Sequence, residues 1–262
     1  MIPRKIHYCW FGNSPLPEKD QKCIESWKKY CPDYEIVEWN EQNYDINQCI
    51  YMKEAYHNRK WGFVPDYARY DIIYREGGIY LDTDVEIIRN IDELLKYEGF
   101  MGFESDKSVA AGLGFGAEAG NKVLKEMRDA YHQISFVREN GSLNLKPSPQ
   151  YTTELLQKMG LRADGSSQQI NGMKIFSSEY LAPLCYANNK LKITKNTYSI
   201  HWYHASWYGE EERRIMQRVQ KVNRIFGVTL GRGVNRIINA IYIIKDDGFK
   251  ELGCRIKKKV GK

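Results

Sequence analysis

Two carboxylates separated by one residue, Asp82 and Asp84, follow an apolar run within residues 77–86, Gly-Gly-Ile-Tyr-Leu-Asp-Thr-Asp-Val-Glu. In an extended chain this spacing puts both side chains on one face, roughly 7 Å apart. Such a pair at the end of a buried strand is costly unless something positive satisfies it. It suits a hard divalent cation that also holds phosphate oxygens. Taken alone, however, an Asp-X-Asp triplet is more often an ordinary polar turn. The residues around it must therefore show whether this pair binds a cation.

The segment before this pair carries a second polar group. Apolar residues recur every four positions over residues 64–76 and two glycines follow, which predicts a helix that ends at the glycines. Asp66, Arg69 and Tyr70 share one face of this helix. On their own, Asp66 and Arg69 indicate a weak surface ion pair. Helix–turn–strand geometry brings Asp66 close to Asp82, and there a carboxylate and a guanidinium can grip sugar hydroxyls.

A third cluster lies far along the chain, in residues 201–207, His-Trp-Tyr-His-Ala-Ser-Trp. A metal site made of two aspartates needs a further donor, and an imidazole nitrogen of His201 or His204 is suitable. The Ser206 hydroxyl and the Trp207 indole N–H can donate to a diphosphate oxygen. Packing of the aromatic rings in the core is an equally good interpretation of this segment.

The elements that must position these groups follow an α/β pattern. Residues 2–10 alternate as a strand, residues 17–30 are helical and residues 34–39 form a second strand, which together make one βαβ unit. The helix over 64–76 and the acidic strand extend it. Ligands of such open sheets bind beyond the carboxyl ends of the strands.

Past residue 100 the pattern weakens, and residues 110–117 are small and glycine-rich. The remaining predicted elements are strands at 100–103, 174–176 and 198–201 and helices at 121–136 and 152–159. A chain of 262 residues with 42% hydrophobic and 27% charged residues suits one full-sized domain with a small appendage.

The appendage is basic. Residues 211–262 contain 14 Lys and Arg against 5 Asp and Glu, a net charge of +9, whereas residues 1–210 carry −3. Helices are predicted over 211–226 and 232–247, so the domains expected are 1–210 and a basic helical extension, 211–262. A solvated pair of helices explains this composition. An amphipathic element attracted to an anionic membrane explains it equally well. Nucleic acid is a poor alternative, because no recognisable binding module accompanies the basic residues.

The location expected is cytoplasmic, including peripheral attachment to the inner face of the cell membrane. The N-terminal residues lack the apolar core of a signal peptide, and no run reaches the roughly 18 apolar residues of a membrane span. The six cysteines have no zinc-ligand spacing, so reduced thiols are expected.

Three motifs together resemble glycosyltransferase family 32: residues 2–12, residues 65–70 with 77–85, and residues 200–207. This family includes bacterial capsular and exopolysaccharide glycosyltransferases and yeast mannosyltransferases, and it is similar to the catalytic domain of the large clostridial glucosylating toxins. The resemblance covers about residues 1–210. The middle motif is the most specific, because Asp, Arg, Gly-Gly and Asp-X-Asp occur in the family's order and spacing.

The resemblance implies a GT-A fold, which is an α/β, Rossmann-like arrangement with a mostly parallel central sheet flanked by helices. It also implies a nucleotide-sugar donor, Mn²⁺ or Mg²⁺, and retention of anomeric configuration. The donor contacts carried over are His7, Tyr8, Trp10, Asp66, Arg69, Tyr70, Asp82, Thr83, Ser206 and Trp207. The metal ligands are Asp82, Asp84 and His201, with His204 as the alternative histidine. The catalytic set is Asp66, Arg69, Asp82 and Asp84.

The function predicted is a retaining, metal-dependent glycosyltransferase that moves a hexose to a glycan or a lipid-linked oligosaccharide in capsular or surface polysaccharide synthesis. A UDP-sugar is favoured, although the Trp10 region can stack on either uracil or guanine. The alternative is a non-catalytic protein that keeps the fold and binds nucleotide sugars or glycans. A hydrolase is disfavoured, because retaining hydrolases need two carboxyls about 5 Å apart across the bond.

Overall fold

The computed structural model describes residues 1–204 and 210–260, and it describes side chains as far as residue 238, apart from residues 210, 212 and 236. The chain divides into two compact units. Unit 1 comprises Met1–Leu184 and Lys192–Trp207, and unit 2 comprises Cys185–Leu191 and Tyr208–Lys262.

Unit 1 is built on an eight-stranded sheet in the order β2-β1-β3-β7-β5-β9-β8, with β6 paired to β5. Its strands are β1 (Lys5–Cys9), β2 (Glu35–Trp39), β3 (Gly78–Tyr80), β5 (Gly99–Ser105), β6 (Ser108–Ala110), β7 (Phe115–Ala117), β8 (Gln168–Ile170) and β9 (Met173–Phe176). A second, two-stranded sheet pairs β4 (Val85–Ile87) with β12 (Ser199–His201).

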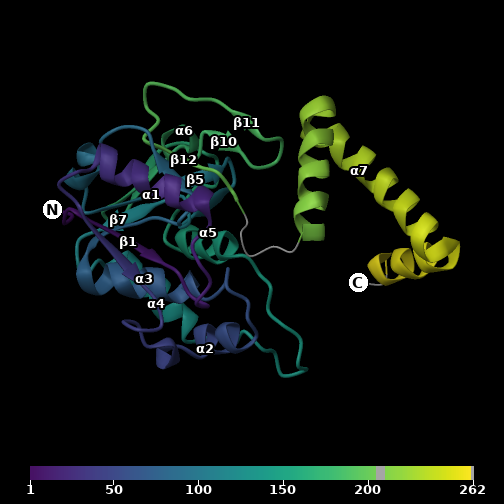
Figure 1. Ribbon diagram of the computed structural model, residues 1–262, viewed down its shortest axis with the longest axis horizontal. Coiled ribbons are helices and arrows are strands. Elements are labelled where there is room, and N and C mark those ends of the chain that lie inside the picture. The colour runs from purple at the N-terminus through teal and green to yellow at the C-terminus, as the bar shows by residue number, and fades with distance from the viewer. Residues whose placement is uncertain (205–209, 261–262) are drawn as a thin grey trace. The chain divides into compact units, whose positions relative to one another are not determined.

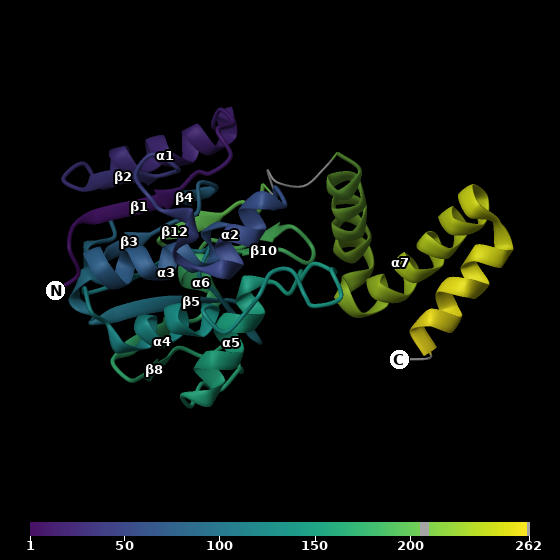
Figure 2. The same cartoon turned by 90° about the horizontal axis from the view of Figure 1, so that it is seen from below.

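The helices of unit 1 are α1 (Glu18–Tyr30), α2 (Ile50–His57), α3 (Pro65–Glu76), α4 (Lys122–Tyr131), α5 (Ser148–Lys158) and α6 (Ser178–Leu181), with 3₁₀ turns at Ile46–Gln48 and Asp92–Lys96. Strands β2, β1 and β3 are parallel and lie side by side in Figure 2. Strand β5 is parallel to β9, whereas β7 is antiparallel to both β3 and β5. The α/β class is therefore confirmed, and the antiparallel pairing of β7, β6 and β8 makes the sheet mixed.

Two hydrophobic cores cover the two faces of the sheet. Trp27 of α1 packs with Ile79 of β3 in one core, and Tyr51 of α2 packs with Tyr70 of α3 and Phe115 of β7 in the other. Figure 1 shows α1 on one side of β1 and α3 with α4 on the opposite side. Because both faces are covered, strand β1 is buried along most of its length.

The glycine pair between α3 and β3 has a steric reason. Gly77 has φ +66° and Gly78 has φ +102°, a region that side-chain-bearing residues rarely adopt. A Cβ atom on Gly78 would also lie 2.9 Å from both His7 Nε2 and the Lys5 carbonyl oxygen. The two glycines therefore end α3 and let the chain enter the sheet directly beside β1.

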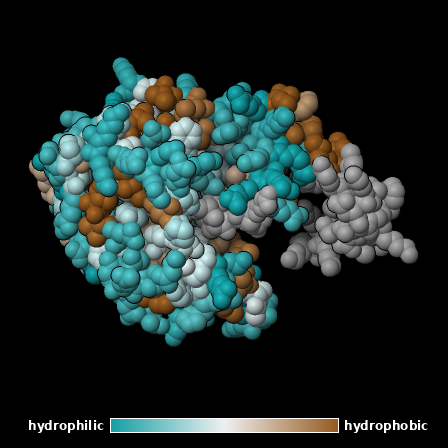
Figure 3. Space-filling model, viewed as in Figure 1, coloured by the Kyte–Doolittle hydropathy of each residue, from teal (hydrophilic) through white to brown (hydrophobic). Residues whose placement is uncertain are grey.

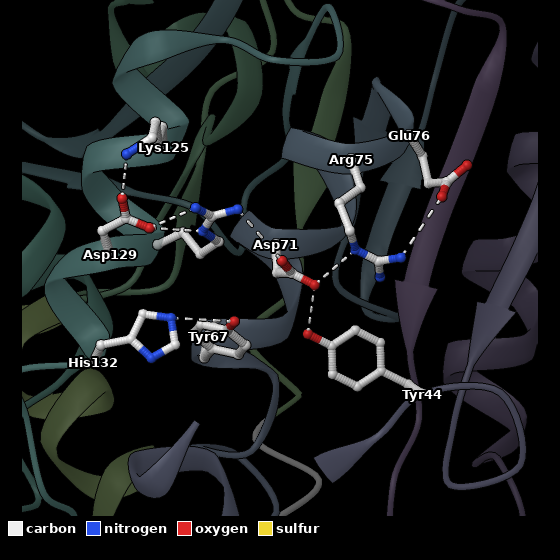
Figure 4. Close-up of polar contacts among 9 residues, drawn as sticks. Tyr44, Tyr67, Asp71, Arg75, Glu76, Lys125, Asp129 and His132 are labelled. Carbon is white, nitrogen blue, oxygen red and sulfur yellow. Dashed lines mark hydrogen bonds and ion pairs between the residues drawn. The ribbon is translucent and has the colours of Figure 1, made fainter. Parts of the chain in front are cut away.

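Helix α3 is anchored on the side away from the acidic pair by a buried carboxylate, Asp71. The Tyr44 hydroxyl and Arg75 Nε each donate to Asp71 Oδ2 at 2.9 Å, and Arg128 Nη1 lies 3.8 Å from Oδ1 (Figure 4). Tyr44 belongs to the loop after β2 and Arg128 to α4. This network fixes α3 to its neighbours.

Unit 2 contains Cys185 of β10 (Leu184–Cys185), its hairpin partner β11 (Lys190–Leu191) and the helical segment α7 (Glu210–Val260). Gly227, within α7, has φ +74°, which is outside the range of a regular α-helix, and Figure 1 shows α7 bent. Asn235 Nδ2 donates to Asn223 Oδ1 at 3.3 Å, although twelve residues of straight helix span about 18 Å. The chain therefore reverses near Gly227, and the two helices predicted on either side of it are confirmed.

Among the residues that the structure describes, no helix is both long enough and apolar enough to cross a membrane. The cysteines whose side chains are described are free thiols: Cys9, Cys23, Cys31, Cys49 and Cys185.

The His7 ring is 1% exposed, and both of its nitrogens are engaged in hydrogen bonds. Trp39 Nε1 donates to His7 Nδ1 at 3.1 Å, so the ring proton sits on Nε2, which donates to the Gly77 carbonyl oxygen at 3.0 Å. Burial lowers the pKa of His7 from 6.5 to about 4.

This buried imidazole predicts acid sensitivity of the fold. Between about pH 6.5 and pH 4 the unfolded chain binds a proton at His7 that the folded chain does not, so stability falls as the pH falls through this window. We expect His7 to lower the free energy of unfolding by about 2 kcal/mol between pH 7 and pH 5. Urea unfolding at both pH values measures this, and His7→Gln should lose that part of the pH dependence. An unchanged pH dependence in His7→Gln would contradict the assignment.

Candidate active site

Arg69 of α3 is the buried cation that links the helix to the acidic pair. Its Nη2 atom lies 3.3 Å from Asp66 Oδ1 and 3.6 Å from Asp82 Oδ1. The guanidinium also stacks 5.1 Å from the centre of the Tyr80 ring, and its Nε donates to the Pro65 carbonyl oxygen at 3.2 Å. The structure thus brings together the helix and strand residues that the sequence placed as neighbours.

Asp66 is almost fully enclosed, with 2% of its surface exposed. The Tyr51 hydroxyl donates to its Oδ2 at 3.2 Å. Burial raises the pKa of Asp66 to about 7 even though Arg69 opposes this. Near neutral pH this carboxyl group can therefore either donate or accept a hydrogen bond.

The Asp-Thr-Asp triplet is a turn, and the extended geometry expected for it was wrong. The Val85 N–H donates to the Asp82 carbonyl oxygen at 3.1 Å, which closes the turn directly after β3. The chain turns here because β4 leaves the main sheet and pairs antiparallel with β12. The turn brings one possible ligand atom from each of Asp82, Asp84 and His201 within 4.8 Å of one another.

Pairing of β12 with β4 places His201 at the acidic turn. In the ladder His201 is opposite Val85, and its Nε2 lies 3.0 Å from Asp84 Oδ1. The backbone N–H of His204 donates to Asp84 Oδ2 at 2.9 Å, and that of Trp202 donates to the Asp84 carbonyl oxygen at 3.0 Å. The C-terminal strand of unit 1 thus holds Asp84 at both its carboxylate and its backbone.

The charges of this cluster are strongly coupled. Burial raises the pKa of Asp82, with Arg69 opposing it. For Asp84, burial is outweighed by His201, so its pKa is lowered. For His201, burial is likewise outweighed by Asp84, so its pKa is raised. Each member of the Asp84–His201 pair thus favours the charged form of the other.

The residues present fit a divalent cation. Two carboxylates and one imidazole give an O, O, N donor set, and carboxylates are the ligands that Mg²⁺ and Mn²⁺ prefer. The position next to Asp84 is held here by His201 Nε2, and a cation would take the place of the proton on that nitrogen. Among the described residues, the cluster includes His201 and not His204.

Other residues predicted to contact the donor lie elsewhere in unit 1. The His7 ring is enclosed in the core with both nitrogens engaged, and the Tyr70 hydroxyl lies 2.6 Å from Thr152 Oγ1 of α5. The Tyr8 hydroxyl donates to Glu38 Oε2 at 2.6 Å. Their side chains are thus occupied by contacts that support the strands and helices around the site.

Trp10 follows β1 and is partly exposed, with its indole N–H donating to the Ser14 carbonyl oxygen at 2.6 Å. It is the member of the first motif whose ring is most open to a ligand. Thr83 lies in the acidic turn and is buried. Ser206 and Trp207 lie outside the residues that the structure describes, so their predicted contacts with the donor stay predictions.

Two residues at the site were missed by sequence reasoning. The Gly112 carbonyl oxygen accepts from the Asp82 N–H at 3.4 Å, and a Cβ atom on Gly112 would lie 2.3 Å from Asp82 Oδ2. The small, glycine-rich composition of residues 110–117 was the available signal. Asp20 of α1, 1% exposed, lies 2.6 Å from His204 Nδ1, and no motif pointed to it.

Comparison with known proteins agrees with this geometry. Residues 17–101, which hold Arg69 and the acidic turn, match the family model described as the glycosyltransferase sugar-binding region containing DXD motif. The resemblance to DXD-type glycosyltransferases is therefore confirmed for this segment, which is similar to their sugar-binding regions.

Relatives with glycosyltransferase names extend the match. The chain is 32% identical over 115 residues to inositol phosphoceramide mannosyltransferase 3 of Schizosaccharomyces pombe, covering 42% of this chain and 32% of that protein. It is 25% identical over 219 residues to an uncharacterized glycosyltransferase of Acanthamoeba polyphaga mimivirus, covering 79% and 84%. The solved structure of PaToxG glycosyltransferase matches with a TM-score of 0.46 at 18% identity, covering 60% and 69%. The chain spans about a third of the length of the fission-yeast relative.

Close approach of Gly112 to Asp82 predicts a specific defect. In Gly112→Ala the added methyl group must displace the Asp82 carboxylate, so we expect a destabilisation of about 1–3 kcal/mol and a smaller thermal shift on adding Mn²⁺. Thermal unfolding with and without Mn²⁺ measures both effects. Gly233→Ala in α7 is the matched control, because nothing lies within 4 Å of its Cβ position. A Gly112→Ala protein with unchanged stability and Mn²⁺ response would refute the steric argument.

Proposed function

We propose that this protein is a metal-dependent, retaining glycosyltransferase that moves a hexose from a nucleotide sugar to a hydroxyl group of a glycan or a lipid-linked oligosaccharide. The observation that carries the proposal is the convergence of Asp82, Asp84 and His201, with Arg69 joining Asp82 to Asp66. The match of residues 17–101 to a DXD sugar-binding region supports the same conclusion.

The proposed chemistry needs residues that hold a divalent cation and residues that bind the donor sugar, and the site offers candidates for each. A divalent cation, Mn²⁺ or Mg²⁺, held by Asp82, Asp84 and His201, would stabilise the negative charge of the departing diphosphate. Asp66 and Arg69 offer a buried carboxyl and a guanidinium for the hydroxyls of the donor sugar. Because both are nearly enclosed and fixed by Tyr51 and the Pro65 carbonyl, they are preorganised for binding.

The proposal of retention is supported by the contacts of the carboxylates. Asp82 and Asp84 belong to the cation cluster and Asp66 is paired with Arg69, so none of the three is left as a covalent nucleophile. We therefore propose that the acceptor hydroxyl attacks the anomeric carbon of the sugar from the same face that the diphosphate leaves. The bond from the anomeric carbon to the diphosphate oxygen breaks, a bond to the acceptor oxygen forms, and the leaving phosphate takes the acceptor's proton.

The donor that we favour is a UDP-sugar, since the partly exposed Trp10 ring can stack on a pyrimidine. The acceptor would belong to a capsular or other surface polysaccharide. The fission-yeast relative is named as a mannosyltransferase, so GDP-mannose is the donor to compare first.

A donor screen tests the proposed function. We expect UDP-glucose, UDP-galactose, UDP-N-acetylglucosamine or GDP-mannose to raise the melting temperature in the presence of Mn²⁺, and the nucleotide sugar that does so to be hydrolysed slowly without an acceptor. Asp84→Ala should lower this hydrolysis at least a hundredfold, since it removes a direct ligand. Its control is Glu86→Ala, two residues further on and outside the cation cluster. NMR of the released sugar gives its anomeric configuration.

Two outcomes would overturn the proposal. Binding of a nucleotide sugar without any turnover would favour the non-catalytic alternative. Hydrolysis that survives in Asp84→Ala and remains dependent on Mn²⁺ would remove the acidic turn from the metal site.

We further propose that the protein works in the cytoplasm at the inner face of the membrane and attaches there through α7. Ile225, Phe226 and Leu230 are 65%, 50% and 70% exposed on either side of the reversal at Gly227. Arg224 and Arg232 flank them and are exposed. Figure 3 shows hydrophobic residues gathered at the top of α7. Exposed apolar side chains bordered by arginines suit the interface of an anionic bilayer.

Vesicle co-sedimentation tests this attachment. Replacing Ile225, Phe226 and Leu230 by Ser should weaken binding to vesicles containing phosphatidylserine by about tenfold or more, because burial of each side chain is lost. Leu145→Ser with Ile193→Ser is the control, since both residues are 53% exposed in unit 1. Equal binding by the triple variant and the control would reject the membrane role of α7.

A further inference from the structure

Asp20 is a buried carboxylate that the proposed chemistry does not yet use. It lies in the first turn of α1, where acidic residues are favoured by the helix dipole, and that alone is a reason for an acid here. Yet Asp20 is 1% exposed, whereas surface acids at helix starts remain in water. A carboxylate so enclosed requires hydrogen-bonding partners.

Its partners come from two distant parts of the chain. Thr83 Oγ1 donates to Asp20 Oδ2 at 3.2 Å, and His204 Nδ1 lies 2.6 Å from Asp20 Oδ1. The two partners are 63 and 184 residues away in sequence. No side chain caps the N-terminus of α1, so the Asp20 carboxylate serves these two residues and not its own helix.

Both partners are joined directly to Asp84. Thr83 is its neighbour in the acidic turn, and the His204 N–H donates to Asp84 Oδ2 at 2.9 Å. The other carboxylate oxygen, Oδ1, lies 3.0 Å from His201 Nε2. Asp20 therefore ties the turn that carries Asp84 to the segment that holds the Asp84 carboxylate in place.

We propose that Asp20 is a positioning residue for the cation site: it fixes Asp84 through Thr83 and through His204, whose contribution is its backbone N–H and not metal ligation. This inference rests on the cation site of the proposed function. Carboxylates that orient the groups around a metal typically contribute 10–100-fold to its affinity. A purely structural role would change stability and leave that affinity unchanged.

Mn²⁺ binding to the full chain, followed by electron paramagnetic resonance of the free ion, separates these roles. We expect Asp20→Asn to raise the Kd for Mn²⁺ by about tenfold or more. The matched control is Asp71→Asn: Asp71 is also buried and bonded to residues of other elements, but its network lies on α3 and α4 (Figure 4). Asp71→Asn should lower the melting temperature and leave the Kd unchanged.

Thr83→Val keeps the shape of the side chain and removes one of the two links, so it tests the inference even where Asp20→Asn folds poorly. We expect a several-fold rise in Kd, and no further rise when Thr83→Val is added to Asp20→Ala, since the group that accepts the Thr83 hydrogen bond is then already absent. A Kd within twofold of the wild type in Thr83→Val and in folded Asp20→Asn would overturn the inference. Asp84→Ala separates failure of the positioning role from failure of the cation site itself. If Asp84→Ala abolishes Mn²⁺ binding and Asp20→Asn leaves that binding unaltered, only the positioning role of Asp20 fails. If the wild type and Asp84→Ala bind Mn²⁺ equally, the cation site itself fails and the inference with it.

Discussion

The arrangement of the site depends on Arg69, a buried positive charge between two carboxylates. A guanidinium that is 5% exposed is strongly unfavourable unless its partners are fixed, and Asp66 and Asp82 lie 3.3 and 3.6 Å from it. Because Arg69 lies on α3 and Asp82 follows β3, this pairing requires the helix to end and the strand to begin within a few residues. The two glycines with positive φ make that possible. The acidic turn is thus held at one end by Arg69.

The other end of the turn is held by the last strand of unit 1. Pairing of β12 with β4 brings His201 to Asp84, and the following backbone N–H groups bond the same residue. Asp20 of α1 adds a third attachment through His204. Elements from the start, the middle and the end of unit 1 therefore converge on one turn. This convergence gives the carboxylates a fixed geometry without a ligand, which is the condition for preorganised binding of charge.

Many of the elements that position the site could be predicted from the sequence, because each depends on a local pattern of residues. The alternating strand before residue 10, the amphipathic helix over residues 64–76 and the glycine pair after it all form as predicted. The central strand β7 could not be foreseen. Its Gly116 has no side chain because a Cβ atom there would lie 2.7 Å from the Phe100 ring, so a buried strand carries the composition of a loop. Strand β4 is likewise only three residues long and is defined by its pairing with β12, which forms where the sequence predicted a strand.

The sequence by itself determined which groups are present: an Asp-X-Asp pair, an aspartate and an arginine three residues apart on a helix, and histidines after a late strand. These follow from spacing along single elements, where periodicity fixes which side chains share a face. Only the tertiary structure decided how they are used. In the structure the acidic pair lies in a tight turn, and His201 lies next to it in the cluster. His7 and Tyr70 are buried in the core, whereas Asp20 and Gly112 lie close to the site. These choices depend on contacts between elements far apart in sequence, and local propensity holds no information about them.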